Sequence, residues 1–129
     1  SLASRLVGRW TMEKHGSRTL HLKSDGSATV EARLNLLASL VYGERLKLDL
    51  TWTLEGDVMS QAISGGTPEA AVQRLTRDWG DRREYRVIEV DEEHLVLSEV
   101  GDDGDRDVWR RVHAQESTAG TAGKEQSPR

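Results

Sequence analysis

The chain has 129 residues, a mass of 14.4 kDa and a formal net charge of −4, a size that suits one domain with its own hydrophobic core. The acidic balance argues against a nucleic-acid partner held mainly by phosphate contacts, because that mode of binding needs a basic surface. Cysteine is absent, which excludes disulfides, thiolate metal sites and cysteine nucleophiles.

Apolar and polar residues alternate through most of the chain, the pattern of strands with one buried face. The first predicted strand covers residues 8–14, and Gly16 turns the chain toward a second strand at 18–23. A turn at 24–27, Ser-Asp-Gly-Ser, leads to a third strand at 28–34. The second and third strands therefore read as a hairpin.

Residues 36–42 interrupt the alternation. They fit either a short helix or a hydrophobic loop folded over one end of the core, and a loop or a single turn is the favoured interpretation. The clearest strand follows at 44–54, where polar residues alternate with five apolar ones: Leu46, Leu48, Leu50, Trp52 and Leu54. A helix would scatter these five side chains around its circumference.

A tight turn at Glu55-Gly56-Asp57 precedes a returning strand at 58–63. A short helix is predicted for residues 67–79, with Thr67 as the N-cap and Pro68 at the first helical position. Gly80 would end this helix.

The last part of the domain predicts a three-stranded meander at 85–90, 95–100 and 107–112. From residue 113 onward no apolar residue is larger than alanine, so a disordered polar tail is predicted for 113–129. About eight short strands fit a sandwich or a barrel, and closure favours the barrel because it removes exposed strand edges. The predicted fold is one all-β domain over residues 1–112, an antiparallel up-and-down barrel of about eight strands with one short helix inserted.

No stretch reaches the roughly 18 apolar residues of a membrane-spanning helix. The chain begins with Ser1 rather than methionine. This favours an extracytoplasmic location, periplasmic or secreted, with an upstream signal or anchor removed.

The run Leu6-Val7-Gly8-Arg9-Trp10 resembles the opening of lipocalin-like, or calycin, barrels, in which a short turn leads into Gly-x-Trp on the first strand. The turn at 24–27, residues 51–57 and the closing run from 85 to 97 are also similar to bacterial lipocalin-like families, so that the resemblance covers residues 2–112. It implies that an arginine of the last strand, Arg110 or Arg111, packs over Trp10 and closes one barrel end by cation-π stacking.

Catalytic and metal-binding patterns are missing from the sequence. The acidic turn at 102–107 lacks the spacing of an EF-hand, and the glycines at 64–67 are interpreted as the start of a helix rather than an anion nest. No enzyme activity, metal or cofactor is predicted. The four histidines do not stand at metal-ligand spacing: His15, His21, His94 and His113.

The four tryptophans are the remaining functional lead. Trp10 is interpreted as the plug of the barrel end and Trp52 as a core residue. Trp79 ends the predicted helix. Trp109, if it points outward, would be an exposed aromatic anchor for a partner.

Two functions fit these observations. A barrel of about eight strands either holds one small ligand or fills with side chains. The alternative to ligand binding is therefore a filled-core structural or protein-interaction module, tethered to a membrane through upstream sequence. For the first function, a small apolar or amphipathic ligand would be held by eight inward-facing residues: Leu22, Val30, Leu48, Leu50, Trp52, Met59, Tyr85 and Leu97.

Overall fold

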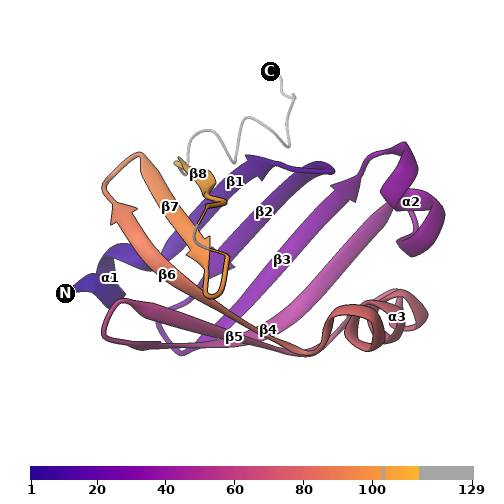
Figure 1. The fold of residues 1–129 in the computed structure, drawn as a ribbon, viewed down its shortest axis with the longest axis horizontal. Helices are drawn as coiled ribbons and strands as arrows, with labels where there is room; N and C mark the ends of the chain where they lie inside the picture. The colour runs from indigo at the N-terminus through magenta and orange to yellow at the C-terminus, as the bar shows by residue number, and fades with distance from the viewer. Residues whose placement is uncertain (103, 114–129) are drawn as a thin grey trace, which may run out of the picture.

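Eight strands form a closed barrel in the computed structural model, which describes residues 1–102 and 104–113. Each strand pairs antiparallel with the next, and β8 pairs with β1 (Figure 1). The predicted up-and-down barrel is confirmed. Its strands are β1 (Gly8–Glu13), β2 (Gly16–Leu22), β3 (Ser27–Leu34), β4 (Arg45–Glu55), β5 (Val58–Thr67), β6 (Arg82–Val90), β7 (His94–Glu99) and β8 (Asp107–Val112).

Strand β4 shows how the alternating sequence produces the barrel. Leu50 and Trp52 are buried, whereas Asp49 and Thr51 beside them are exposed. Successive side chains of a strand point to opposite faces, so that every second residue faces the interior. The inward residues of the strands then pack into one main core.

Helices stand at both ends of the barrel (Figure 1). Helix α1 (Leu2–Leu6) precedes β1, begins with a capping box at Ser1 and buries Leu6 completely against the core. Helices α2 (Leu36–Tyr42) and α3 (Glu69–Trp79) lie together at the opposite end. Among the described residues, no helix has both the length and the apolar character that crossing a membrane requires.

The segment at 36–42 is a helix, so the favoured loop or single turn was wrong. Asn35 is the N-cap, with its side-chain oxygen accepting a hydrogen bond from the Ala38 amide at 3.0 Å. At the other end, the Gly43 amide donates to the Ser39 carbonyl at 2.9 Å. These two caps satisfy backbone groups that a seven-residue helix cannot pair internally.

Helix α3 begins one residue later than predicted, at Glu69 instead of Pro68, and Thr67 is not its N-cap. Thr67 is the last residue of β5 and pairs with Lys47 of β4. Pro68 takes the N-cap position in an extended conformation and makes no side-chain cap hydrogen bond. The glycines at 64–67, interpreted from the sequence as the start of a helix, therefore belong to a strand.

Gly66 allows β5 to pass closely between β4 and α3. Its φ is +151°, and a Cβ atom there would lie 2.1 Å from the Lys47 carbonyl oxygen and 2.9 Å from Val72 Cγ2. Only glycine fits this backbone contact. Gly66 thus sets where α3 packs on the barrel.

The predicted polar tail at 113–129 lies, apart from His113, outside the described residues. Residue 103 of the predicted acidic turn also lies outside them.

Candidate ligand-binding site

The barrel end that carries α1 is closed by Trp10 and Arg111. Trp10 is fully buried, and the Arg111 guanidinium carbon stands 4.1 Å from the centre of its ring. The structure therefore selects Arg111 from the two arginines that the sequence left open. Arg111 also donates hydrogen bonds to the carbonyls of Arg5 at 2.9 Å and Glu92 at 2.9 Å, which ties β8 to α1 and to the β6–β7 turn.

The glycine of Gly-x-Trp has a direct role in this closure. Gly8 has a φ of +138°, and a Cβ atom there would lie 2.7 Å from Arg111 Nη1. The missing side chain leaves room for the guanidinium to reach the Val7 carbonyl, to which Nη1 donates at 3.3 Å.

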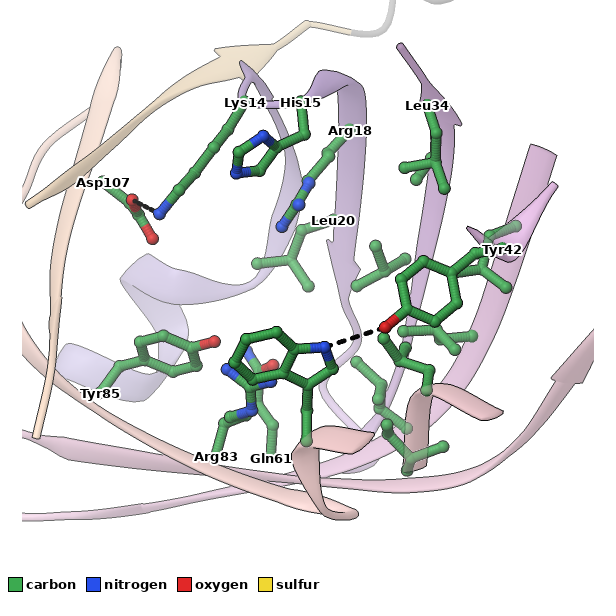
Figure 2. Close-up of a pocket in the computed structure, with 18 of the residues that line it drawn as sticks. Lys14, His15, Arg18, Leu20, Leu34, Tyr42, Gln61, Arg83, Tyr85 and Asp107 are labelled. Carbon is green, nitrogen blue, oxygen red and sulfur yellow. Dashed lines mark hydrogen bonds and ion pairs between the residues drawn. The ribbon is translucent and has the colours of Figure 1, made fainter. Parts of the chain in front are cut away.

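A cavity of about 400 Å³ occupies the other half of the barrel, between the core and the end that carries α2 and α3 (Figure 2). Apolar side chains from β2, β3, β4 and β7 form most of its wall. Polar and charged side chains gather near Lys14 and Arg18. The lining comprises Lys14, His15, Arg18, Leu20, Val30, Ala32, Leu34, Ala38, Tyr42, Leu46, Leu48, Leu50, Gln61, Ile63, Leu75, Trp79, Gly80, Asp81, Arg83, Tyr85, Leu97, Asp107 and Trp109.

The cavity brings together five of the eight residues expected to hold a ligand. The other three, Leu22, Trp52 and Met59, are buried in the core and do not line it. Trp52 instead anchors a turn, with its Nε1 donating to the Lys23 carbonyl at 2.9 Å. The five that line the cavity are Val30, Leu48, Leu50, Tyr85 and Leu97.

Sequence reasoning missed the polar part of the lining. Arg18 stands two residues before Leu20, and Arg83 stands two residues before Tyr85, so each shares the inward face of its strand. Gln61 is related to Met59 in the same way. The alternation of inward and outward side chains along each strand could have identified these residues. They were missed because charged and amide side chains on strands were interpreted as outward-facing.

Two of the cavity's three cationic side chains have carboxylate partners. Lys14 Nζ is 3.1 Å from Asp107 Oδ1, and Arg83 Nη1 is 3.5 Å from Glu99 Oε2. The Arg18 side chain makes neither a hydrogen bond nor an ion pair with any described residue, and its Nε atom is buried. Burial lowers the pKa of the Arg18 guanidinium from its ordinary value.

Tyr85 contributes a hydroxyl group to the wall of the cavity. Burial raises its pKa above the ordinary value of a phenol, while the nearby charge of Arg83 acts in the opposite direction. The hydroxyl is therefore protonated at neutral pH and able to donate a hydrogen bond.

Trp109 faces inward, which corrects the idea of an exposed anchor. It is 7% exposed and lines the cavity, whereas its neighbour Val108 is 55% exposed. The alternation of β8 explains this, because Trp109 has the parity of Arg111. Its Nε1 atom is buried without a hydrogen-bond partner among the described residues.

Aromatic residues of α2 and α3 meet at the outer end of the cavity (Figure 2). Trp79 Nε1 donates to the Tyr42 hydroxyl at 3.0 Å, and that hydroxyl donates to Asp78 Oδ2 at 3.1 Å. Arg83 stands 5.8 Å from the Trp79 ring centre. Trp79 is nevertheless 62% exposed, so this end of the cavity faces solvent.

Metal-binding geometry does not occur in the part of the chain that the structure describes. No three histidine, aspartate or glutamate side chains there come together as ligands. His94 and His113 lie instead near single carboxylates of the β6–β7 turn, those of Asp91 and Glu93.

A closed eight-stranded antiparallel barrel with a tryptophan–arginine plug at one end is a lipocalin-like fold. A lipocalin-like protein from Bacteroides uniformis matches with a TM-score of 0.60 at 16% identity, over 84% of this chain and 99% of that one. An uncharacterized protein from Bacteroides eggerthii matches with a TM-score of 0.53 at 16% identity, over 82% and 98%. No family model and no curated protein matches the sequence. The chain is thus a lipocalin-like small β-barrel with structural neighbours in bacteria.

Proposed function

We propose that this protein binds a small apolar or amphipathic molecule inside the barrel. The observation that carries the proposal is the cavity of about 400 Å³ beside a well-packed core. Sites for small molecules commonly measure about 300–1,000 Å³ and combine apolar walls with a few polar groups. Leu48 and Val30 are only partly buried although they face inward, because they border this space.

The same lining favours binding without catalysis. Its polar side chains include three cations, two carboxylates, an imidazole, an amide and two hydroxyls: Lys14, Arg18, Arg83, Asp81, Asp107, His15, Gln61, Tyr42 and Tyr85. The lining contains no serine, threonine or cysteine that a neighbouring base could activate as a nucleophile. Contact between the cavity wall and an apolar ligand would contribute about 25 cal/mol per Å² of surface removed from water.

A second candidate, a protein-interaction module, is favoured by one surface feature. Leu36, Leu37 and Leu40 of α2 are 76–77% exposed, and Val41 is 46% exposed. Contiguous exposed apolar residues commonly mark sites of contact with proteins or membranes. This surface lies on the helix that supplies Ala38 and Tyr42 to the cavity, so both functions would use the same end of the barrel.

Titration with the neutral apolar dye Nile red, excited outside the tryptophan band, tests the first proposal. We expect saturable enhancement of dye emission. Val30→Trp places an indole inside the cavity and should weaken dye binding at least about tenfold. Thr29→Trp adds the same group to the outer face of β3 and should leave it unchanged.

Circular dichroism confirms that both variants fold before the comparison is made. Absence of saturable binding, or equal binding by the Val30→Trp variant, would contradict the proposal. Loss of binding in a Leu37→Asp, Leu40→Asp double variant, with Val30→Trp unaffected, would place the dye on α2 and favour the interaction module.

A further inference from the structure

We infer that the ligand carries a single carboxylate, which the Arg18 guanidinium binds inside the cavity. This inference rests on the proposed function and adds the chemical class of the ligand, an amphipathic acid. Three steps support it: the place of Arg18, the state of its charged neighbours, and the hydrogen-bond donors around it.

Arg18 is built into the cavity wall by strand register. It pairs with Met12 of β1 and Ala32 of β3, and it has the inward parity of Leu20. Figure 2 shows its side chain pointing into the cavity beside Leu20. Arg18 is half-buried, and its Nε atom has almost no exposed surface.

Arg18 differs from the other two cations of the cavity lining, Lys14 and Arg83. Lys14 is paired with Asp107 and lies 3.8 Å from Asp105, and Arg83 is paired with Glu99. The Arg18 side chain makes no ion pair or hydrogen bond among the described residues, although the charge of Asp107 acts on it from a distance. Taking a charge partly out of water without a direct partner costs free energy. An anion in the cavity would remove that cost.

Two hydrogen-bond donors of the cavity wall lack acceptors. Arg18 Nε and Trp109 Nε1 are the buried side-chain atoms without a hydrogen-bond partner in the described part of the chain, and both residues line this cavity. These two atoms have almost no accessible surface, so a ligand would reach the Arg18 guanidinium through its Nη atoms. An ionised carboxylate offers them acceptor oxygens and no donor. The Tyr85 hydroxyl and the Gln61 amide line the same cavity and are further donors (Figure 2).

The charge balance favours a carboxylate over a phosphate. Lys14 is ion-paired with Asp107 and Arg83 with Glu99, which leaves the single positive charge of Arg18 as the lining cation without an ion pair among the described residues. A carboxylate supplies one negative charge, whereas a phosphate monoester carries about 1.5 to 2 near neutral pH. The bidentate geometry of arginine suits either group.

Displacement of Nile red by four probes with the same twelve-carbon chain tests the inference at pH 8, below the micelle concentration. The probes are dodecanoate, dodecanol, monododecyl phosphate and dodecyltrimethylammonium. We expect dodecanoate to bind at least about tenfold more tightly than dodecanol and than the phosphate. The trimethylammonium probe should bind most weakly.

Arg18→Gln should remove the preference for dodecanoate over dodecanol and change dodecanol affinity by less than about twofold. Arg33→Gln is the matched control, because this substitution removes the same charge. Arg33 lies exposed on the outer face of β3. The headgroup preference of this variant should stay at the wild-type ratio. In the ligand-free protein, Arg18→Met should raise the Tm, since it removes a half-buried charge that has no ion pair or side-chain hydrogen bond among the described residues.

Each remaining outcome counts against a specific claim. Equal affinity for dodecanoate and dodecanol in the wild type overturns the inference and leaves the proposed function intact. Failure of every probe and of Nile red itself overturns the proposed function. Preference for the phosphate overturns the carboxylate assignment. If Arg18→Gln fails to fold, Arg18→Lys keeps the charge and should retain part of the preference.

Discussion

At the scale of single residues, Arg111 connects three elements that are far apart in the sequence. Its guanidinium stacks on Trp10 of β1 and donates to carbonyls of α1 and of the β6–β7 turn. A planar group with five donors can stack and donate at the same time, which a lysine ammonium cannot. The barrel end is therefore closed by shape and hydrogen bonding together, and not by charge alone.

Arg111→Lys should lower the free energy of unfolding by about 1–3 kcal/mol, through loss of the stacking contact and of hydrogen bonds from a charged donor. Urea unfolding followed by far-UV circular dichroism measures the loss. Arg9→Lys makes the same replacement at an exposed position of β1 and should change stability by less than about 0.5 kcal/mol. Equal effects of the two variants would refute the role given to Arg111.

At the scale of elements, the sequence predicts which side chains of a strand face the barrel interior. It does not predict how far along the barrel axis each of them lies. Leu22 and Leu48 have the same inward parity, yet Leu22 belongs to the packed core and Leu48 borders the cavity. Their positions depend on the register of neighbouring strands and on which end Arg111 closes. The alternation within one strand contains neither piece of information.

The strands predicted from the sequence are also shorter than the observed β5 and β6. Residues 64–67 and 82–84 carry glycines and charges instead of apolar residues at alternate positions, so the period-two pattern stops before the strands do. Residues 65–67 pair with β4 and residues 82–84 pair with β5, and this pairing extends the strands where the side-chain pattern does not predict them. Arg83 was missed as a cavity residue for this reason, whereas Tyr85 was found.

Gly66→Ala tests whether the close passage of β5 positions α3. The added Cβ would overlap the Lys47 carbonyl oxygen, and the backbone φ is unfavourable for alanine. We expect a loss of about 2–4 kcal/mol of unfolding free energy. Gly65→Ala is the matched control, because the nearest atom to its Cβ would be Asp49 Oδ2 at 3.9 Å.

Urea unfolding measures both glycine variants, and near-UV circular dichroism, to which Trp79 of α3 contributes with the other aromatic residues, reports on side-chain packing. A Gly66→Ala protein as stable as the Gly65→Ala protein would show that β5 can move away from β4 without cost. The helix would then be held by other contacts.

At the scale of the whole molecule, the two ends of the barrel differ in how firmly they are held. The end closed by Trp10 contains most of the fully buried side chains, including Leu6, Leu22 and Met59. The cavity end is covered by α2, a helix with no buried residue that depends on its two caps and on the hydrogen bond between Tyr42 and Trp79. Local opening should therefore start at α2, where a ligand would pass.

Hydrogen exchange followed residue by residue by NMR tests this difference. Opening free energies within one protein range from near zero to the global value, and segments with few buried contacts lie at the low end. The amides of Val41 and Tyr42 should exchange at least about a hundredfold faster, relative to their intrinsic rates, than those of Leu20 and Leu97. The comparison needs no ligand. Equal protection at both ends would mean that α2 opens only when the whole barrel unfolds, and ligand entry would then require another route.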